Sequence, residues 1–263
     1  MRKRQKKLKN QIRSYIKNIY RFLRKKADKI YRIMLELIFP RRCPVCDKIV
    51  NPFGEQICPL CRHKIRYIRE PRCKQCGKGL QSEEKEYCYD CTAITHSYRR
   101  GLALYEYASV KSSIHRFKYQ GRCEYADFYG TDIAQKLGSQ IKSWKPDALV
   151  PVPIHDSKRN ERGYNQAELI AEILGKELGI PVNAKCIQRC KKTIPQKELD
   201  DQARRNNLKR AFKICQNDVK LKSIIIIDDI YTTGSTIDAI AKAFHKTGEY
   251  EIYYIALSIG KGF

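Results

Sequence analysis

The sequence predicts an α/β protein in which a parallel-sheet domain (residues 99–263) follows a small cysteine-rich domain (42–98) and a basic amphipathic helix (1–41). Three observations support this prediction. Apolar, β-branched runs alternate with amphipathic stretches in the last part of the chain, four Cys-x-x-Cys pairs precede them, and the first 41 residues repeat apolar side chains at helical spacing. Strands that alternate with helices form parallel sheets with right-handed crossovers.

Composition and charge exclude several classes of protein. A hydrophobic content of 42% is enough to build a core, which excludes wholesale disorder. No uncharged apolar run approaches the roughly 18 residues that a transmembrane segment needs. The basic N-terminus lacks the uninterrupted apolar region and small-residue cleavage site of a secretory signal. We therefore expect a cytoplasmic protein, and its formal net charge of +25 favours polyanionic partners such as nucleic acid, phosphorylated small molecules or acidic lipid.

The first 42 residues carry sixteen Lys or Arg and two acidic residues, a net charge of +14. Their apolar residues recur at alternating steps of four and three, and Pro40 closes the pattern. These residues are Ile12, Ile16, Ile19, Leu23, Ala27, Ile30, Met34 and Leu37. The helix they predict could pack on its own protein or remain solvated, form a short coiled coil, or lie peripherally on an anionic membrane surface.

Eight of the twelve cysteines form four Cys-x-x-Cys turns that repeat every fifteen residues. The pairs are Cys43/Cys46, Cys58/Cys61, Cys73/Cys76 and Cys88/Cys91. Each such turn points two thiolates at one tetrahedral Zn²⁺, so four turns predict two structural zinc sites. A disulfide framework would need an oxidising compartment, which no export signal supports. A redox pair would need only one turn and a βαβ setting, which is absent here.

The spacing leaves open whether the turns pair in sequence, first with second and third with fourth, or interleave. Sequential pairing needs only short hairpins and is favoured on that ground. The segment is short and polar, so we expect metal binding to supply most of its folding free energy. The other thiols, Cys123, Cys186, Cys190 and Cys215, are interpreted as ordinary buried or surface cysteines.

Beyond residue 99, three apolar runs predict buried strands at Ala148–Val152, Ser223–Ile227 and Ile252–Leu257. Amphipathic stretches between and after them predict helices at Gln166–Leu178 and Thr236–Thr247. Ligands of such sheets bind at the carboxyl ends of the strands, which directs attention to the residues after the first two runs.

After the isoleucine run come two adjacent carboxylates, Asp228 and Asp229, and then a short loop that leads into a helix. The loop consists of Thr232, Thr233, Gly234, Ser235 and Thr236. Its backbone N–H groups, its hydroxyls and the positive end of the helix dipole would cradle an anion. Adjacent carboxylates beside a phosphate site suit ribose hydroxyls and Mg²⁺.

After the strand at residues 148–152 comes a basic loop containing Lys158, Arg159 and Arg162, followed by a helix that starts near Asn165. These three side chains could converge on a diphosphate, because Arg offers paired donors and Lys a point charge. A solvated charged loop is the alternative interpretation, and the presence of the acidic strand end makes it less favoured.

Residues 223–236 resemble the phosphoribosyl-pyrophosphate (PRPP) motif of type I phosphoribosyltransferases. That resemblance implies that Asp228 and Asp229 hold the ribose hydroxyls with Mg²⁺ and that residues 232–236 hold the 5′-phosphate. From about residue 35 onward the chain resembles the ComF family of competence-associated proteins, in which a zinc ribbon precedes a phosphoribosyltransferase-like domain. The supporting segments are residues 37–43, the basic–aromatic stretch 114–122, and 193–212, which is similar to the flexible loop that covers the site in these folds.

The resemblance implies two functions. In the first, the chain acts in natural competence and DNA uptake by handling single-stranded DNA, with a competence helicase or an anionic membrane surface as a partner of its N-terminal helix. In the second, it is an Mg²⁺-dependent phosphoribosyltransferase, in which a nitrogen nucleophile of unknown identity displaces diphosphate from C1 of PRPP. Thr232 stands where purine-salvage members commonly carry a carboxylate base, which argues against hypoxanthine-type activity.

The segment Arg116-Phe117-Lys118-Tyr119 has two interpretations. Its aromatic rings could stack on bases while its cations neutralise phosphates, as in proteins that bind single strands. Alternatively it is a helix whose aromatic side chains lie partly in the core.

Overall fold

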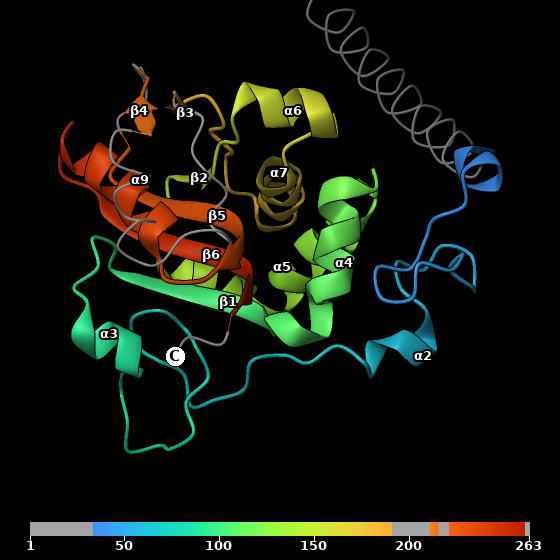
Figure 1. Cartoon of the computed structure of the whole chain (residues 1–263), viewed down its shortest axis with the longest axis horizontal. Helices are drawn as coiled ribbons and strands as arrows, with labels where there is room; N and C mark the ends of the chain where they lie inside the picture. The colour runs from blue at the N-terminus through green and yellow to red at the C-terminus, as the bar shows by residue number, and fades with distance from the viewer. Residues whose placement is uncertain (1–33, 191–210, 216–220, 261–263) are drawn as a thin grey trace, which may run out of the picture. The chain divides into compact units, whose positions relative to one another are not determined.

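A computed structural model describes residues 34–190, 211–215 and 221–260. Its described part contains a four-stranded sheet in the order β1-β6-β5-β2, with every neighbouring pair parallel (Figure 1). The strands are β1 (Arg100–Glu106), β2 (Ala148–Pro151), β5 (Ser223–Tyr231) and β6 (Glu251–Ile259). The predicted parallel α/β class is therefore confirmed.

Helices cover both faces of the sheet, which is why its central strands are almost continuously apolar. The helices are α4 (Tyr107–Tyr119), α5 (Tyr125–Ser143), α7 (Gln166–Leu178) and α9 (Ser235–His245). Successive residues of β5 point to opposite faces. Ile225 and Ile227 share a core with α4, α5 and α7, whereas Ile224 and Ile226 share one with α9.

All three predicted strands are present, and two are longer than predicted. β5 continues from the isoleucines to Tyr231, pairing with β6 as far as Ile259, so Asp228 and Asp229 lie within the strand instead of beyond its end. Helix α7 has the predicted bounds, and α9 begins one residue early, at Ser235.

The predicted basic loop is wrong, because residues Asp156–Arg162 form the short helix α6. His155 caps it by accepting the N–H of Ser157 at Nδ1, 3.2 Å away, and the helix ends at Gly163 with φ of 79°. A charged heptapeptide without an apolar face carries no helical periodicity, so only the caps signal this helix.

A second, two-stranded antiparallel sheet is formed by β3 (Ile187–Arg189) and β4 (Phe212–Ile214). Most of the segment expected to cover the site, residues 193–210, lies outside the described residues. Residues 1–33, most of the predicted N-terminal helix, also lie outside them, and residues 34–38 are helical.

Each cysteine-rich half packs on a different face of the sheet. The first half, which contains α2 (Pro59–Arg62), contributes Cys43, Ile57 and Cys61 to the core that includes α4, α5 and α7. The second half, which contains α3 (Tyr89–Ala93), contributes three cysteines to the core that includes α9. Residues 42–263 thus form one compact unit, separate from residues 1–41. No helix among the described residues has the length and apolar character needed to cross a bilayer.

Candidate functional site

The eight paired cysteines form two tetrads in the sequential combination: Cys43, Cys46, Cys58 and Cys61, then Cys73, Cys76, Cys88 and Cys91. Within each tetrad the sulfur atoms all lie within 4.8 Å of one another. The Cys46–Cys58 and Cys76–Cys88 Sγ separations are 3.9 and 3.6 Å. Tetrahedral zinc with Zn–S bonds of about 2.3 Å requires sulfur atoms about 3.8 Å apart, so both tetrads fit Zn²⁺.

Main-chain groups of both ribbons are tied to the α/β domain. Arg116 Nη2 on α4 donates to the carbonyl oxygens of Pro44 and Val45, in the first ribbon, at 3.0 and 2.8 Å. Tyr254 Oη on β6 donates to the Cys76 carbonyl oxygen, in the second, at 2.7 Å. These contacts orient the ribbons against the sheet through their metal-binding turns.

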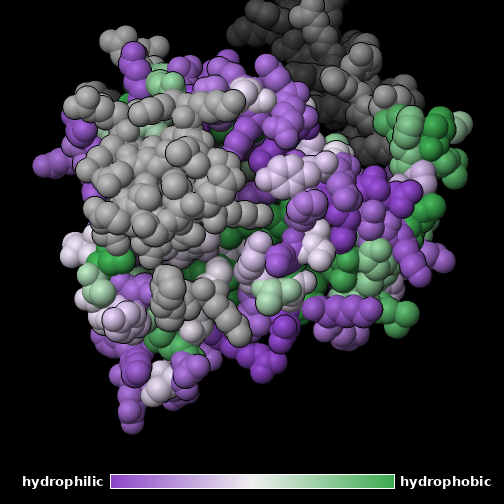
Figure 2. Space-filling view, viewed as in Figure 1, coloured by the Kyte–Doolittle hydropathy of each residue, from purple (hydrophilic) through white to green (hydrophobic). Residues whose placement is uncertain are grey.

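A cleft of about 1550 Å³ opens at the carboxyl ends of β2 and β5 and extends to the second ribbon, where Tyr87 and Tyr89 line it. Its sheet end is lined by Lys118, Lys158, Arg162, Arg189, Asp228, Asp229, Thr232, Thr233 and Thr236. Figure 2 shows hydrophilic residues over α6, the helix that follows β2. The structure thus brings the two predicted strand ends together in one site.

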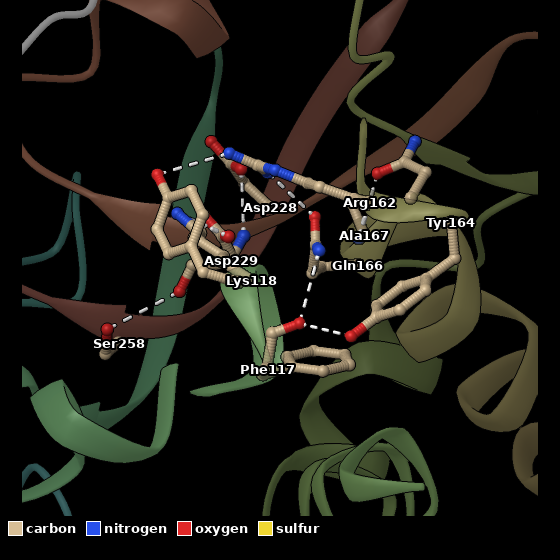
Figure 3. Close-up of polar contacts among 11 residues, drawn as sticks. Phe117, Lys118, Arg162, Tyr164, Gln166, Ala167, Asp228, Asp229 and Ser258 are labelled. Atoms are coloured by element: carbon tan, nitrogen blue, oxygen red, sulfur yellow. Dashed lines mark hydrogen bonds and ion pairs between the residues drawn. The ribbon is translucent and has the colours of Figure 1, made fainter. Parts of the chain in front are cut away.

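The acidic pair at the end of β5 is already engaged with a cation. Lys118 Nζ lies 2.6 Å from Asp229 Oδ2, and the Asp229 N–H donates to Asp228 Oδ1 at 2.8 Å (Figure 3). Burial, followed by the neighbouring Asp229 charge, raises the pKa of Asp228 to about 7, against smaller opposing effects of Lys118 and Arg189. Burial and the charge of Asp229 therefore both disfavour the ionised form of Asp228.

The loop between β5 and α9, which the sequence predicts to be an anion cradle, turns through a left-handed residue. Gly234 adopts φ of +78°, and a Cβ at this position would lie 2.5 Å from Tyr231 Oη. Thr233 Oγ1 and Ser235 Oγ are 2.6 Å apart. Thr232, Thr233 and Thr236 face the cleft, whereas Gly234 and Ser235 are buried beneath it and do not line it.

Two of the three predicted cations of the basic segment reach the cleft. Lys158 and Arg162 lie four residues apart on one side of α6. Burial, and then the neighbouring Arg162, Arg189 and Lys118, lower the pKa of Lys158. Arg159 instead pairs with Glu168 and lines a separate hollow of about 430 Å³.

Two cations at the sheet end of the cleft, Lys118 and Arg189, were absent from the predicted set. Arg189 belongs to β3, and burial lowers its pKa while the charge of Asp228 partly offsets that effect. No local pattern in the sequence marks Arg189. Lys118 lies within the basic–aromatic segment, but nothing in the sequence assigns it to Asp229.

The interpretation of residues 116–119 as a base-stacking segment is wrong for Phe117. Its ring is fully buried in the core with α5 and α7, and Arg116 is bound to the first ribbon. Only Tyr119 retains an exposed ring, 50% accessible, with the Arg162 guanidinium 4.8 Å from its centroid. The core-helix interpretation therefore holds for the first half of the segment.

The fold and site define a class of protein, in which two four-cysteine ribbons are joined to a parallel α/β domain with a cleft at the carboxyl ends of its strands. The chain is 30% identical to Competence protein F of Haemophilus influenzae, over 81% of this chain and 95% of that protein. It therefore belongs to the family of Competence protein F, the ComF family.

Other relatives agree with this assignment. Competence protein ComFC of Bacillus subtilis is 28% identical over 74% of this chain and 80% of its own. The DNA utilization protein YhgH of Salmonella typhimurium is 28% identical over 81% of this chain and 94% of its own. The family description of a double zinc ribbon domain matches residues 34–92.

Two solved structures are similar to this chain in part. A purine phosphoribosyltransferase from Pyrococcus horikoshii is 20% identical and covers 51% of this chain and 88% of its own, with a TM-score of 0.32. A hypoxanthine phosphoribosyltransferase from Staphylococcus aureus is 11% identical and covers 52% and 74%, with a TM-score of 0.33.

Proposed function

We propose that this protein handles single-stranded DNA during natural competence and holds a phosphorylated ribose, such as that of PRPP, in the cleft at the end of β5. One observation carries the proposal. The acidic pair Asp228 and Asp229, the three threonines of the loop at residues 232–236, and Lys158 and Arg162 of α6 line the same cleft. The first group matches a sugar diol, the second a phosphate, and the third a diphosphate.

The extension of the cleft supports DNA as the larger ligand. Tyr87, Tyr89 and Tyr119 line it with 42%, 75% and 50% of their surfaces exposed. Lys78 and Lys111 line it too. Exposed aromatic rings beside cations suit bases that stack while their phosphates are neutralised. The names of the relatives, two competence proteins and a DNA utilization protein, support the same role.

Mg²⁺ would enter the site with PRPP. The carboxylate oxygens of Asp228 and Asp229 are the hard ligands that this cation prefers, so the residues fit it. A bound Mg²⁺ would neutralise the leaving diphosphate, while the two aspartates orient the ribose.

The role of residues 1–41 also belongs to the proposal. Their described end exposes Leu37, Ile38 and Phe39, which suits a peripheral contact with an anionic membrane or a helicase.

The test uses labelled PRPP and a 5′-phosphorylated single-stranded oligonucleotide, each titrated against the full chain. The double variant Asp228→Asn/Asp229→Asn should bind PRPP at least about tenfold more weakly, because it loses charge-assisted contacts to the diol and metal. Glu172→Gln/Glu177→Gln, two exposed positions on α7, is the matched control and should bind as the wild type does. Oligonucleotide affinity should fall steeply with salt, with a log–log slope of about −0.7 per neutralised phosphate.

Absence of binding of both ligands at moderate salt would contradict the proposal. Oligonucleotide binding that is insensitive to salt would show that the basic surplus is not the contact surface.

Transfer of the phosphoribosyl group to a nitrogen acceptor is the second candidate function. The raised pKa of Asp228, about 7, favours it, since this carboxylate could take a proton from an incoming amine near neutral pH. Release of diphosphate from PRPP in the presence of ammonia or nucleobases would measure it. Release that persists unchanged in Asp228→Asn would exclude this role for the residue.

A further inference from the structure

Lys118 makes an ion pair within the proposed ribose site. Its Nζ lies 2.6 Å from Asp229 Oδ2, and the two side chains are only 19% and 13% exposed. Lys118 and Asp229 both line the cleft, so the pair belongs to the ligand site and is not a remote structural contact. An ammonium group in this position neutralises a carboxylate that would otherwise repel a bound diphosphate.

The backbone that carries Lys118 is held on both sides. The carbonyl oxygen of Phe117 accepts hydrogen bonds from Tyr164 Oη at 2.5 Å and from Gln166 Nε2 at 3.3 Å (Figure 3). Next along the chain, the Tyr119 ring lies against the guanidinium of Arg162, 4.8 Å from the ring centroid. The last turn of α4 is therefore anchored to α6 and α7. These contacts fix the backbone position from which the Lys118 side chain reaches Asp229.

The charges around the cleft favour an anion even without a metal ion. Lys158, Arg162 and Arg189 line it together with Lys118, so four cations and two aspartates share the sheet end of the cleft. Cations that are preorganised in this way need no reorganisation when a phosphorylated ligand arrives.

We propose that Lys118 is a tethered cation that supplies at Asp229 the positive charge a divalent ion would otherwise supply, so that the protein binds PRPP in the absence of divalent cations. The inference rests on the proposed function, because it concerns the same ligand site. Mg²⁺ can still bind with PRPP, but the affinity for PRPP should not depend on it.

The experiment measures PRPP binding to the full chain by calorimetry, once in excess EDTA over a short exposure that leaves the zinc content unchanged, and once in excess Mg²⁺. Wild-type affinities in the two conditions should differ by less than about tenfold. Lys118→Met should bind PRPP about ten- to a hundredfold more weakly in EDTA, the loss expected for a charge-assisted contact, and Mg²⁺ should restore most of it. Lys118→Arg, which keeps the charge, should retain binding in EDTA.

Lys142→Met is the matched control for loss of one positive charge, since Lys142 is exposed on α5 outside the cleft, and it should match the wild type in both conditions. Thermal unfolding of each variant verifies that it is folded before titration. Wild-type binding that requires Mg²⁺, with Lys118→Met unchanged or tighter, would overturn the inference and leave the proposed function standing. No PRPP binding in either condition would overturn both.

Discussion

His96 Nδ1 lies 2.8 Å from Asp238 Oδ2, in a contact between residues 142 positions apart in the chain. His96 follows the last ligand of the second zinc tetrad by five residues, and its side chain is only 1% exposed. Asp238 lies in the first turn of α9, where its N–H donates to the Gly234 carbonyl oxygen at 2.8 Å. The second ribbon is thereby joined to the helix that follows the loop at residues 232–234.

Replacing His96 with alanine should therefore lower the free energy of unfolding of the protein. It should also lower the affinity of the loop at residues 232–236 for its ligand. Asp238 would lose a partly buried partner, which typically costs about 1–3 kcal/mol of unfolding free energy. Urea unfolding followed by circular dichroism measures this cost, and PRPP titration should show weaker binding. His245→Ala is the control, because exposed His245 makes one hydrogen bond, to the Ser97 carbonyl oxygen, and its loss should cost under about 1 kcal/mol. Equal losses in the two variants would contradict this expectation.

Gly234 is expected to be intolerant of any side chain. Gly234→Ala would adopt a left-handed backbone at φ +78° and place its Cβ 2.5 Å from Tyr231 Oη. Gly163 has nearly the same φ, +79°, with no atom within 4 Å of a Cβ, so Gly163→Ala isolates the backbone cost. We expect about 1 kcal/mol for Gly163→Ala and about 2–4 kcal/mol for Gly234→Ala in urea unfolding. A smaller loss at Gly234 than at Gly163 would show that the loop relaxes around the methyl group.

Each zinc tetrad should bind one equivalent of metal independently. Cys46→Ser and Cys76→Ser should each reduce the zinc content from two equivalents to one, and Cys123→Ser, an exposed thiol outside both tetrads, should leave two. Because a structural zinc site contributes on the order of 10 kcal/mol, chelation should unfold residues 43–91. Elemental analysis after gel filtration, with thermal unfolding, measures both effects. A folded ribbon segment without bound metal would refute the zinc assignment.

Stability should depend on the ionisation of Asp147. Its Oδ2 accepts the N–H groups of Lys222 and Ser223 at 2.7 and 2.9 Å, at the entry to β5. These backbone hydrogen bonds lower the pKa of Asp147 below 3.8. A carboxyl whose folded-state pKa is lowered stabilises the protein above its unfolded-state pKa, and this contribution is lost as pH falls through the folded value.

Asp147→Asn should therefore be less stable than wild type at pH 7, by about 1 kcal/mol after allowance for solvent screening at this exposed site. The difference should shrink as pH falls below the usual range of an aspartate pKa, because the lowered pKa of Asp147 is then approached and its carboxylate becomes protonated. Unfolding midpoints of both proteins between pH 2.5 and 7 test this, and a difference that stays constant over that range would contradict it.

The zinc tetrads and the main strands could be predicted because their determinants are local. Two Cys-x-x-Cys turns a few residues apart define a metal site, and a run of isoleucines defines a strand buried on both faces. Helix α6 could not be predicted in this way, because Asp156–Arg162 has no apolar periodicity and is defined by its caps. Arg189 belongs to a three-residue strand that reaches the cleft only through the second sheet.

The sequence by itself determined the metal-binding turns, the succession of strand, loop and helix at residues 223–245 and the resemblance to a family, since each depends on residues close together in the chain. Only the tertiary structure decided that the first ribbon packs beside α4 and the second beside α9, that Phe117 is core, and that Lys118 meets Asp229. Those contacts join segments separated by tens to more than a hundred residues. Their partners are selected by packing against the two faces of the sheet, which no local pattern encodes.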